Sequence, residues 1–461
     1  MALFPLSYAQ RSLWLLHQFA PEGGAYNVNI PLHIRSIIDT NRLRICLDRL
    51  LQRHEMLRAR YIFDGKELGY EISPNPLWQI QEITVAPTTS NEALWEVVSR
   101  HSHEVFPLDQ WPVFRVFLFS RGPQDKIFLF STHHINGDLF SIAQLMEELF
   151  ALYASPDPEH HPLPPVEATF AEHVQEQKEF LEGPEGQRQW AYWSSQLMGP
   201  LPKIHFPLDH PRPAIQGHQG AMILSRIPQE LNLGLREITG VERTTLFSTL
   251  LAIFYASLYA ITGQSDLIVG TPVPGRRGKN RFERVMGTFV NVLPLRARLE
   301  PGVSFRDLLQ QVTRLVKQGR EHQDFPFPLL VERLRIPRDT SRTPVFQTYF
   351  TLQRLPHRPE LLLFFLPMET PFTMSVGDLT VGTVPLPQQE GQLEVAVHVY
   401  DVNHELFVEY KYNKDLFEKR TVERMMESYL DIARQVVESM DWPLSRLLAP
   451  RWESCSSEAA H

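Results

Sequence analysis

Two adjacent histidines and a nearby aspartate, in the stretch STHHINGDLFS at residues 131–141, are the side chains of this sequence best suited to acid–base chemistry. A neutral imidazole can accept a proton near pH 7 and then return it. Asp138 follows His134 by four residues, so one loop could hold a base and the carboxylate that orients it. On spacing alone, a structural or incidental histidine pair remains the more frequent case.

The segments on either side of this stretch predict a rigid support for it. Residues 126–132, KIFLFST, form a short apolar run that is typical of a buried strand. Residues 141–154 have the periodicity of an amphipathic helix, and Ser141 with Gln144 fits a capping box at its start. The histidines therefore lie where a strand is expected to end and a helix to begin, a junction that commonly carries function.

Other chemistries find weaker support in the sequence. A zinc site needs more ligands than a His-x-x-x-Asp pair, and the Glu-His-His at 159–161 lies in a linker-like stretch without a cysteine cluster. The segment GQSDLIVG at 263–270 lacks the frame of a phosphate-binding loop. The sequence also lacks the Gly-x-Ser-x-Gly elbow of many serine hydrolases. We therefore expect no metal site.

Length and composition predict a globular protein of at least two units. The chain has 461 residues, of which 43% are hydrophobic and 21% charged, so a large core can form. The net charge is −8 and no block of Lys and Arg stands out, which argues against nucleic-acid binding. The two cysteines, Cys46 and Cys455, are too few for a disulfide framework and favour the reducing cytoplasm.

The sequence gives no indication of export or membrane insertion. The first 16 residues lack the charged start and the small-residue cleavage site of a secretion signal. The apolar segment 245–263 has the length of a membrane span, but it carries several Ser, Thr and Tyr and ends at Gly263, a residue typical of helix ends. We expect a buried helix there.

Alternating helix and strand patterns predict two α/β halves. The first half has a helix over 41–57 capped by Asp39 and then a strand over 58–63. The second half has a strand over 266–273 and helices over 304–322 and 420–440, with Ser304 and Asp307 as a capping pair. Residues 151–169, rich in Pro and charge, indicate a linker. We expect units over 1–172 and 173–448, and a tail over 449–461.

Six motifs, in order along the chain, give this sequence a specific resemblance. It resembles the condensation domain of nonribosomal peptide synthetases. The motifs span roughly 340 residues, so coincidence does not explain them. They are LSYAQRSLWLL (6–16), RHEMLRARY (53–61), HHINGDL (133–139), MGTFVNVLPLR (286–296), HQDFPFPLL (322–330) and RDTSRTPVFQ (338–347).

The resemblance implies a fold and a reaction. It implies a mixed α/β protein of two chloramphenicol-acetyltransferase-like lobes, arranged in a V as a pseudo-dimer with a central tunnel. Upstream donor and downstream acceptor carrier proteins would dock at the two mouths, each inserting a 4′-phosphopantetheine arm. The amine of the aminoacyl thioester on one arm would attack the acyl, peptidyl or polyketide thioester on the other. We expect adjacent synthetase domains, no bound cofactor, no nucleic-acid or membrane partner, and a monomer when the domain is excised.

Roles for individual residues follow from the same resemblance. His134 corresponds to the catalytic histidine, His133 would shape the loop, and Asp138 would hold the loop through an ion pair with Arg276 in PVPGRRGK. Asp138 is thus more architectural than catalytic, although it belongs to the active-site motif. Further residues are expected along the substrate tunnel: Leu139, Phe140, Ser141, Gly287, Phe289 and Asn291.

The sequence departs from the family pattern at several positions. Leu139 stands where the motif has Gly, which removes backbone freedom and adds bulk, so a narrowed or reshaped tunnel is expected. Phe140 stands where Trp is frequent, and a block after the first lobe is degenerate at 169–177. The non-Gly residue after Asp138 resembles condensation domains of hybrid polyketide–peptide assembly lines. The donor could then be polyketide, fatty acyl or of a polyamine type.

Other functions within the superfamily fit the sequence less well. An epimerisation domain shares the two histidines but not the opening signature at 6–16, and a heterocyclisation domain would carry Asp in place of both histidines. A CoA-dependent acyltransferase would lack the other five motifs. A non-catalytic domain that recruits a partner enzyme typically loses the second histidine, which is present here as His134.

Overall fold

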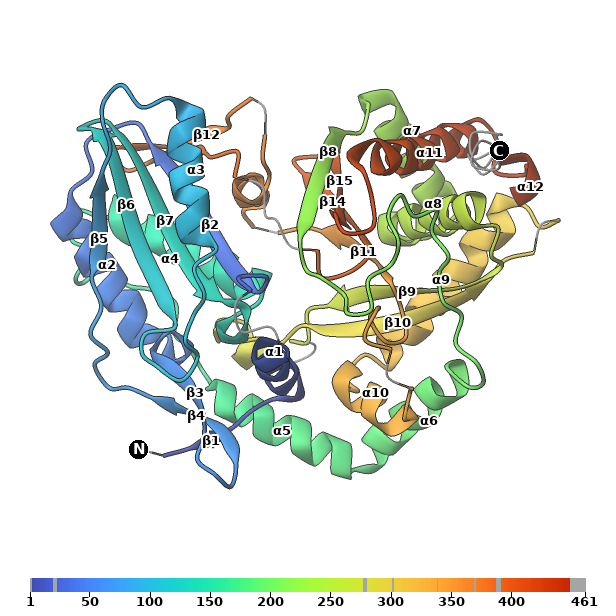
Figure 1. Ribbon diagram of the computed structural model, residues 1–461, viewed down its shortest axis with the longest axis horizontal. Helices are drawn as coiled ribbons and strands as arrows, with labels where there is room; N and C mark the ends of the chain where they lie inside the picture. The colour runs from blue at the N-terminus through green and yellow to red at the C-terminus, as the bar shows by residue number, and fades with distance from the viewer. Residues whose placement is uncertain are drawn as a thin grey trace.

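The computed structural model describes residues 2–19, 23–276, 280–300, 302–337, 339–355, 357–368, 370–386 and 391–447. Two lobes lie side by side, and each is built around a six-stranded sheet (Figure 1). The predicted tail at 449–461, which contains Cys455, lies outside the described residues, as do residues 277–279 and 338 of the motif-bearing stretches.

The first lobe is built on a mixed sheet with the strand order β12-β13-β2-β7-β6-β5. Helices α2 (Thr40–Arg53) and α4 (Leu139–Ala154) pack on one face, and α3 (Asn91–Ser102) packs on the other. A small three-stranded sheet is formed by β1 (Phe4–Pro5), β4 (Leu68–Ile72) and β3 (Ala59–Phe63), next to the 3-10 helix η1 (Glu55–Arg58). The strands of the large sheet are β12 (Thr373–Val376), β13 (Leu379–Thr383), β2 (Asn27–Ile34), β7 (Asp125–His133), β6 (Phe114–Gly122) and β5 (Ile80–Thr84).

The second lobe repeats this layering with the strand order β10-β9-β11-β14-β15-β8. Its helices cover one face of the sheet and share one apolar core with it. They are α7 (Gln229–Val241), α8 (Leu246–Thr262), α9 (Phe305–Glu321), α11 (Lys419–Glu438) and the short α12 (Leu444–Leu447). The strands are β10 (Asn291–Arg298), β9 (Asp266–Val273), β11 (Thr348–Gln353), β14 (Val395–Val402), β15 (Glu405–Asn413) and β8 (Gly220–Arg226).

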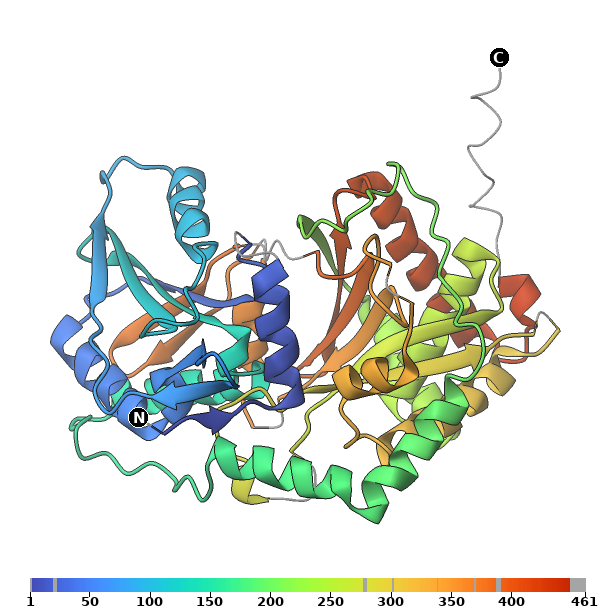
Figure 2. The same ribbon diagram turned by 60° about the horizontal axis from the view of Figure 1, so that its bottom comes forward.

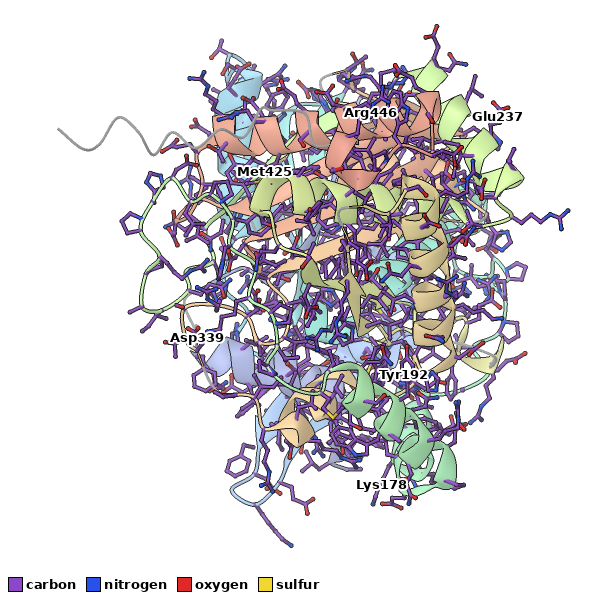
Figure 3. The ribbon with its side chains drawn as sticks, turned by 90° about the vertical axis from the view of Figure 1, so that its right-hand side faces the viewer. Lys178, Tyr192, Glu237, Asp339, Met425 and Arg446 are labelled. Atoms are coloured by element: carbon purple, nitrogen blue, oxygen red, sulfur yellow. The ribbon has the colours of Figure 1, made fainter. Side chains whose placement is uncertain are left out.

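Helices at the base join the two lobes. Helices α5 (Phe170–Glu182) and α6 (Pro184–Gln196) run from one lobe to the other (Figure 2), while α1 (Tyr8–Phe19) lies between them near α10 (Phe327–Leu334). Tyr192 of α6, labelled in Figure 3, stacks on His322 with ring centroids 3.8 Å apart. Trp193 Nε1 also donates to the carbonyl of His322 at 2.8 Å. These contacts fix α6 to the end of α9.

Strand pairing does not follow the predicted division at residue 172. That boundary falls inside α5, and β12 and β13 from the second unit complete the first lobe's sheet, with Val381 opposite Ile34. The 3-10 helix η4 (Pro359–Phe365) also packs into the first lobe's core. Residues 359–383 therefore belong with the first sheet, because the open edge of β2 takes a strand from far along the chain. The remainder of the division into two units stays a prediction.

Most predicted elements are present, and the differences have local causes. The strand at 266–273, the cap at Asp39 and the Ser304–Asp307 capping box are confirmed. The helix predicted to reach residue 57 ends at Arg53, where η1 follows. The capping role assigned to Ser141 was wrong. Helix α4 begins at Leu139 because Asp138 is its N-cap and accepts the Ser141 N–H at 3.0 Å.

The apolar segment 245–263 forms the buried helix α8, and Gly263 ends it in the left-handed conformation with φ of 68°. Within the described ranges, no single helix is long and apolar enough to cross a membrane. The pair α7 and α8 meets that criterion only together, by length and composition, across a bend of 111°.

Candidate active site

His134 lies directly after β7, at the start of the 3-10 turn η2 (His134–Asn136). Its backbone N–H donates to the carbonyl of Tyr26 at 2.8 Å, and its carbonyl accepts the hydroxyl of Thr288 at 2.5 Å. Tyr26 precedes a strand of the first lobe, and Thr288 precedes the first residue of β10 in the second. Both lobes therefore fix the backbone of His134.

The imidazole of His134 is suited to accept a proton. Its Nδ1 is buried and has no hydrogen-bond partner among the described residues. Burial lowers the pKa of His134 below its ordinary value, against the opposing effects of its own backbone and of the Asp138 charge. The ring is therefore neutral near pH 7 and can accept a proton.

His133 has a structural environment. Its Nδ1 accepts the backbone N–H of Ile135 at 3.1 Å, which leaves the proton of the neutral ring on Nε2. The ring packs edge-on against His17, with centroids 5.7 Å apart. Burial, with the neighbouring charges of His17 and His134, lowers the pKa of His133 far below its ordinary value. These contacts support a role in shaping the loop.

Hydrogen bonds of three residues outside the predicted site fix the histidine loop. The hydroxyl of Tyr61 donates to Asn136 Oδ1 at 2.7 Å, and Asn136 Nδ2 donates to the carbonyl of Val113 at 3.0 Å. Gln10 Nε2 donates to the carbonyl of Ile135 at 3.3 Å. Gln10 and Tyr61 lie within the motifs at 6–16 and 53–61, but the spacing of these motifs did not indicate that the two side chains reach the loop.

Asp138 and Arg276 form a nearly buried ion pair between the lobes. Arg276 Nη1 lies 3.0 Å from Asp138 Oδ1 and 2.9 Å from Oδ2. The exposed fractions of the two side chains are 4% for Asp138 and 11% for Arg276. The guanidinium also lies over the ring of Phe289, 4.1 Å from its centroid. The pair therefore joins the start of α4 to the residues that follow β9.

Further hydrogen bonds make this ion pair part of a clasp. It is formed by residues 138–141 at the start of α4 and by Arg276 and residues 285–289 of the segment that joins β9 to β10. Asp138 Oδ2 accepts the Phe289 N–H at 3.1 Å. The Ser141 hydroxyl donates to the carbonyl of Gly287 at 2.9 Å, and Arg276 Nη2 lies 2.7 Å from the same hydroxyl. His134 is not among the hydrogen-bond partners that the structure describes for Asp138, so the carboxylate positions the loop rather than the imidazole.

The residues expected along a tunnel lie in four different environments. Ser141 and Gly287 belong to the clasp. Phe289 is buried against Phe170 and His173, with ring centroids 5.1 and 4.5 Å away. Asn291 ties the start of β10 to the segment before α10, because its amide donates to the carbonyls of Gln323 and Phe325 at 2.8 Å. Phe140 is 37% exposed. A tunnel-lining role for these residues stays a prediction.

Leu139 occupies an ordinary backbone conformation as the first residue of α4. It is not among the described residues with positive φ, and its side chain packs at the margin of the first lobe's core. We therefore expect Leu139→Gly to lower the free energy of unfolding by roughly 1 kcal/mol or more, through backbone freedom and lost packing. Chemical denaturation measures the loss. Donor tolerance is measured by competition between short and bulky donor thioesters. A wider tolerance in Leu139→Gly would contradict the conclusion that Leu139 has a packing role.

Gly287 has no room for a side chain. A Cβ there would lie 2.1 Å from the Phe170 ring, whose position is fixed by Phe289 and His173. Gly287→Ala should therefore destabilise the protein by about 1–3 kcal/mol, the usual cost of overpacking. Gly302→Ala is the matched control, because nothing lies within 4 Å of a Cβ at that position. Equal denaturation midpoints for the two variants would contradict the expectation.

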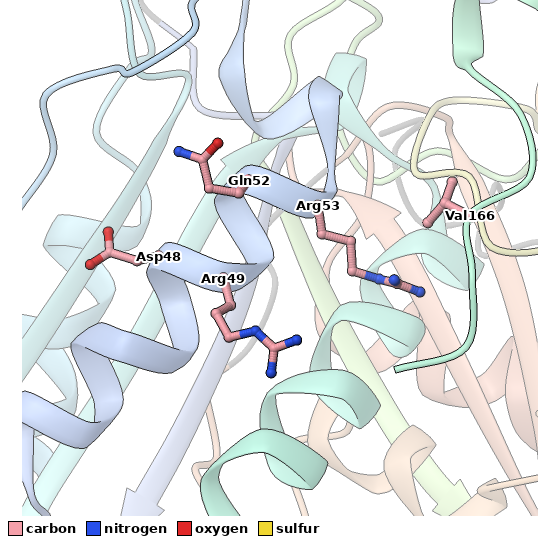
Figure 4. Close-up of a pocket in the computed structure, with 5 residues that line it drawn as sticks. All are labelled: Asp48, Arg49, Gln52, Arg53 and Val166. Carbon is pink, nitrogen blue, oxygen red and sulfur yellow. The ribbon is translucent and has the colours of Figure 1, made fainter. Parts of the chain in front are cut away.

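A surface pocket lies beside α2, away from the histidine loop, and is lined by Asp48, Arg49, Gln52, Arg53 and Val166 (Figure 4). Arg49 Nη1 donates to the carbonyls of Pro158 and His161 at 2.7 and 2.8 Å. Arg53 binds the buried Glu148 and the carbonyl of Pro164. The two arginines thus fasten the linker segment to α2.

In the part of the chain that the structure describes, no cluster of three or more His, Cys, Asp or Glu could hold a metal ion.

Comparison with known proteins identifies the family. The family model for the condensation domain matches residues 2–453. The chain belongs to this family. One of the linear gramicidin synthase proteins of Brevibacillus parabrevis is 32% identical over 442 residues, which cover 94% of this chain and 6% of the relative. Phosphinothricin tripeptide synthetase PhsC of Streptomyces viridochromogenes is 30% identical over 447 residues, covering 96% of this chain and 40% of the relative.

Solved structures agree with the condensation-domain fold. A four-domain nonribosomal peptide synthetase bound to AMP and glycine matches with a TM-score of 0.88 and 25% identity, over 98% of this chain and 34% of that one. The X-domain from teicoplanin biosynthesis matches with a TM-score of 0.84 at 21% identity, over 96% and 97% of the two chains, which shows the fold alone. The expected mixed α/β fold with two chloramphenicol-acetyltransferase-like lobes is thereby confirmed.

This condensation domain spans 6 to 8% of the length of the first curated relatives that it matches. Those relatives are three subunits of linear gramicidin synthase. Their similarity supports a condensation domain of the nonribosomal peptide synthetase type for this chain.

Proposed function

We propose that this condensation domain forms an amide bond between two carrier-bound substrates. The amine of an aminoacyl thioester attacks the carbonyl carbon of an acyl, peptidyl or polyketide thioester. A C–N bond forms, the C–S bond of the donor breaks, and the proton lost by the amine ends on the departing thiol. The observation that carries this proposal is the neutral His134, whose backbone is fixed by Tyr26 and Thr288.

His134 takes or holds the amine proton during the attack. A general base of this kind typically contributes about 10²–10⁴-fold to the rate. His133 shapes the turn, and the Asp138–Arg276 pair holds the start of α4 against the second lobe. Such fixed positioning matters because catalysis falls steeply when reacting groups move by about 1 Å.

The proposed substrates are 4′-phosphopantetheine thioesters of an upstream donor and a downstream acceptor carrier protein, so the domain itself needs no bound cofactor. Adjacent synthetase domains, a cytoplasmic location and a monomeric excised domain are parts of the same proposal. The residue after Asp138 is Leu rather than Gly, as in condensation domains of hybrid polyketide–peptide assembly lines, so the proposed donor is polyketide, fatty acyl or of a polyamine type.

Reconstitution with two carrier proteins tests the function. One carrier is loaded with an acyl group and the other with an amino acid, and the amide product on the acceptor is followed by mass spectrometry. Product that depends on both carriers supports the proposal. Turnover with acyl-CoA and a free amine alone would favour a CoA-dependent acyltransferase. Carrier binding without product would favour a recruitment domain.

A further inference from the structure

The second lobe's sheet has one apolar face and one face with a polar patch. Side chains alternate along each strand, so one register row points to the helices and the next points away. The row toward the helices lies in their apolar core and consists of Phe350, Val397, Tyr410 and Ile223. The neighbouring row points the other way and consists of Thr351, His398, Glu409 and Leu224.

The face with the polar patch is turned toward the first lobe. Tyr400 and Val402 share this face with His398, and both pack into the first lobe's apolar core, as does Phe407. The parallel strands β9, β11 and β14 have their C-terminal ends on the same side of the sheet. On that side, Arg276 follows β9 and binds Asp138 in the loop after His134. Substrates held at His134 therefore lie toward the edge of this face.

Glu409 is a buried carboxyl group on this face, and one of its oxygens has no described partner. Its side chain is fully buried, and its Oε1 has no hydrogen-bond partner among the described residues. Its Oε2 accepts the hydroxyl of Tyr400 at 2.9 Å and lies 4.0 Å from Lys411 Nζ. Burial raises the pKa of Glu409 above its ordinary value. A buried carboxyl oxygen without a partner is costly, so a donor group that reached Oε1 would gain a favourable hydrogen bond.

Two neighbouring side chains also lack hydrogen bonds. The ring of His398 stands directly opposite Glu409 in the β14–β15 ladder, and the ring of Tyr349 lies 6.1 Å from it. Neither side chain hydrogen-bonds to a described residue, and both are partly accessible. Burial and the charge of Lys411 keep His398 neutral, so it can donate at one nitrogen and accept at the other.

We propose that Glu409, His398 and Tyr349 form a polar subsite for a hydroxyl group carried on the acyl or aminoacyl chain of a substrate. A hydroxyl can donate to Glu409 Oε1 and accept from His398 or Tyr349, which matches the three groups. Lys411 already offsets the charge of Glu409, so a cationic substrate group is less suited. This inference rests on the proposed function, because it assumes that substrates lie between the lobes.

Binding of paired probes tests the subsite without requiring turnover. Octanoyl pantetheine amide is compared with its 3-, 5- and 7-hydroxy forms to represent the donor, and seryl with alanyl pantetheine amide to represent the acceptor. Isothermal titration calorimetry should show that the wild-type protein binds at least one hydroxylated member about tenfold more tightly than its deoxy partner. The pair that shows the preference identifies which substrate carries the hydroxyl.

Variants on one strand provide the comparison. Glu409→Leu and His398→Phe should each reduce the preference to about twofold or less, and Glu409→Gln, which keeps an acceptor oxygen, should retain most of it. Tyr410→Phe is the matched control, because it removes a buried, unpartnered hydroxyl next to Glu409 on the opposite face. It should leave the preference unchanged. Thermal unfolding verifies that each variant is folded.

Two results would overturn the subsite. The first is equal binding of every hydroxylated and deoxy pair by the wild-type protein. The second is a preference that survives in both Glu409→Leu and His398→Phe. The reconstituted condensation assay is run in parallel. Absence of amide product with the binding preference intact would defeat the proposed function and leave the subsite standing.

Discussion

Replacing His134 by alanine is expected to slow amide formation by about 10²–10⁴-fold, the usual contribution of a general base. The fold should survive, because the backbone of residue 134 makes the hydrogen bonds to Tyr26 and Thr288 while its Nδ1 has no partner among the described residues. Single-turnover transfer between two loaded carrier proteins measures the rate. Near-normal transfer by the variant would contradict the assignment.

The pH dependence of transfer provides a second measure of the same role. Burial lowers the pKa of His134, so the neutral form persists at pH values where an ordinary histidine is protonated. Protonation of the attacking amine lowers the wild-type and variant rates alike, so the ratio of the two rates reports on the histidine. That ratio should be constant near neutral pH and fall only as the pH drops well below 6.5. His160→Ala, in the exposed linker, is the matched control and should behave as wild type.

Replacing Asp138 by alanine is expected to lower the free energy of unfolding by about 3–5 kcal/mol, because removal of one partner strands the other charge in a nearly buried place. The Phe289 and Ser141 N–H groups also lose their acceptor. Denaturant titration measures the change. The main effect of Asp138→Ala should be a lower free energy of unfolding. The main effect of His134→Ala should be a slower transfer rate, with little change in stability.

A second substitution separates the stranded charge from other effects. Combining Asp138→Ala with Arg276→Met removes the unpaired cation and should recover part of the lost stability. Asp157→Ala, which removes an exposed carboxylate beside His160, should leave the unfolding free energy nearly unchanged. An unfolding free energy for Asp138→Ala equal to that of wild type would show that the ion pair does not hold the lobes together.

Local sequence patterns correctly predicted those helices and strands that depend only on neighbouring residues. The strand at 266–273 and the helix that ends at Gly263 lie where apolar runs and a glycine placed them, because periodicity and left-handed helix ends depend on neighbouring residues. The helix over 304–322 was likewise predictable from Ser304 and Asp307. The start of α4 was not, because Asp138 and Ser141, three residues apart, are both residue types that favour an N-cap.

The motifs also led to the histidine loop and to the pairing of Asp138 with Arg276, but they did not indicate what else holds them. The Ser141 hydroxyl, expected to cap a helix, instead bridges to Gly287 across the lobes. Gln10 and Tyr61 reach the same loop from a helix and a strand more than 70 residues away. Such contacts join distant segments, and no local spacing records them.

By itself, the sequence determined that this chain is an α/β condensation-type protein with His134 at the junction of a strand and a helix, because local periodicity and motifs specify element types and recognisable sites. Only the tertiary structure decided that β12 and β13 complete the first lobe's sheet and that Glu409 and His398 share a face turned toward the first lobe. Alternation along a strand shows that its two faces differ. Long-range packing decides which segment covers each face, because an open sheet edge pairs with a distant strand and an apolar surface packs against another apolar surface.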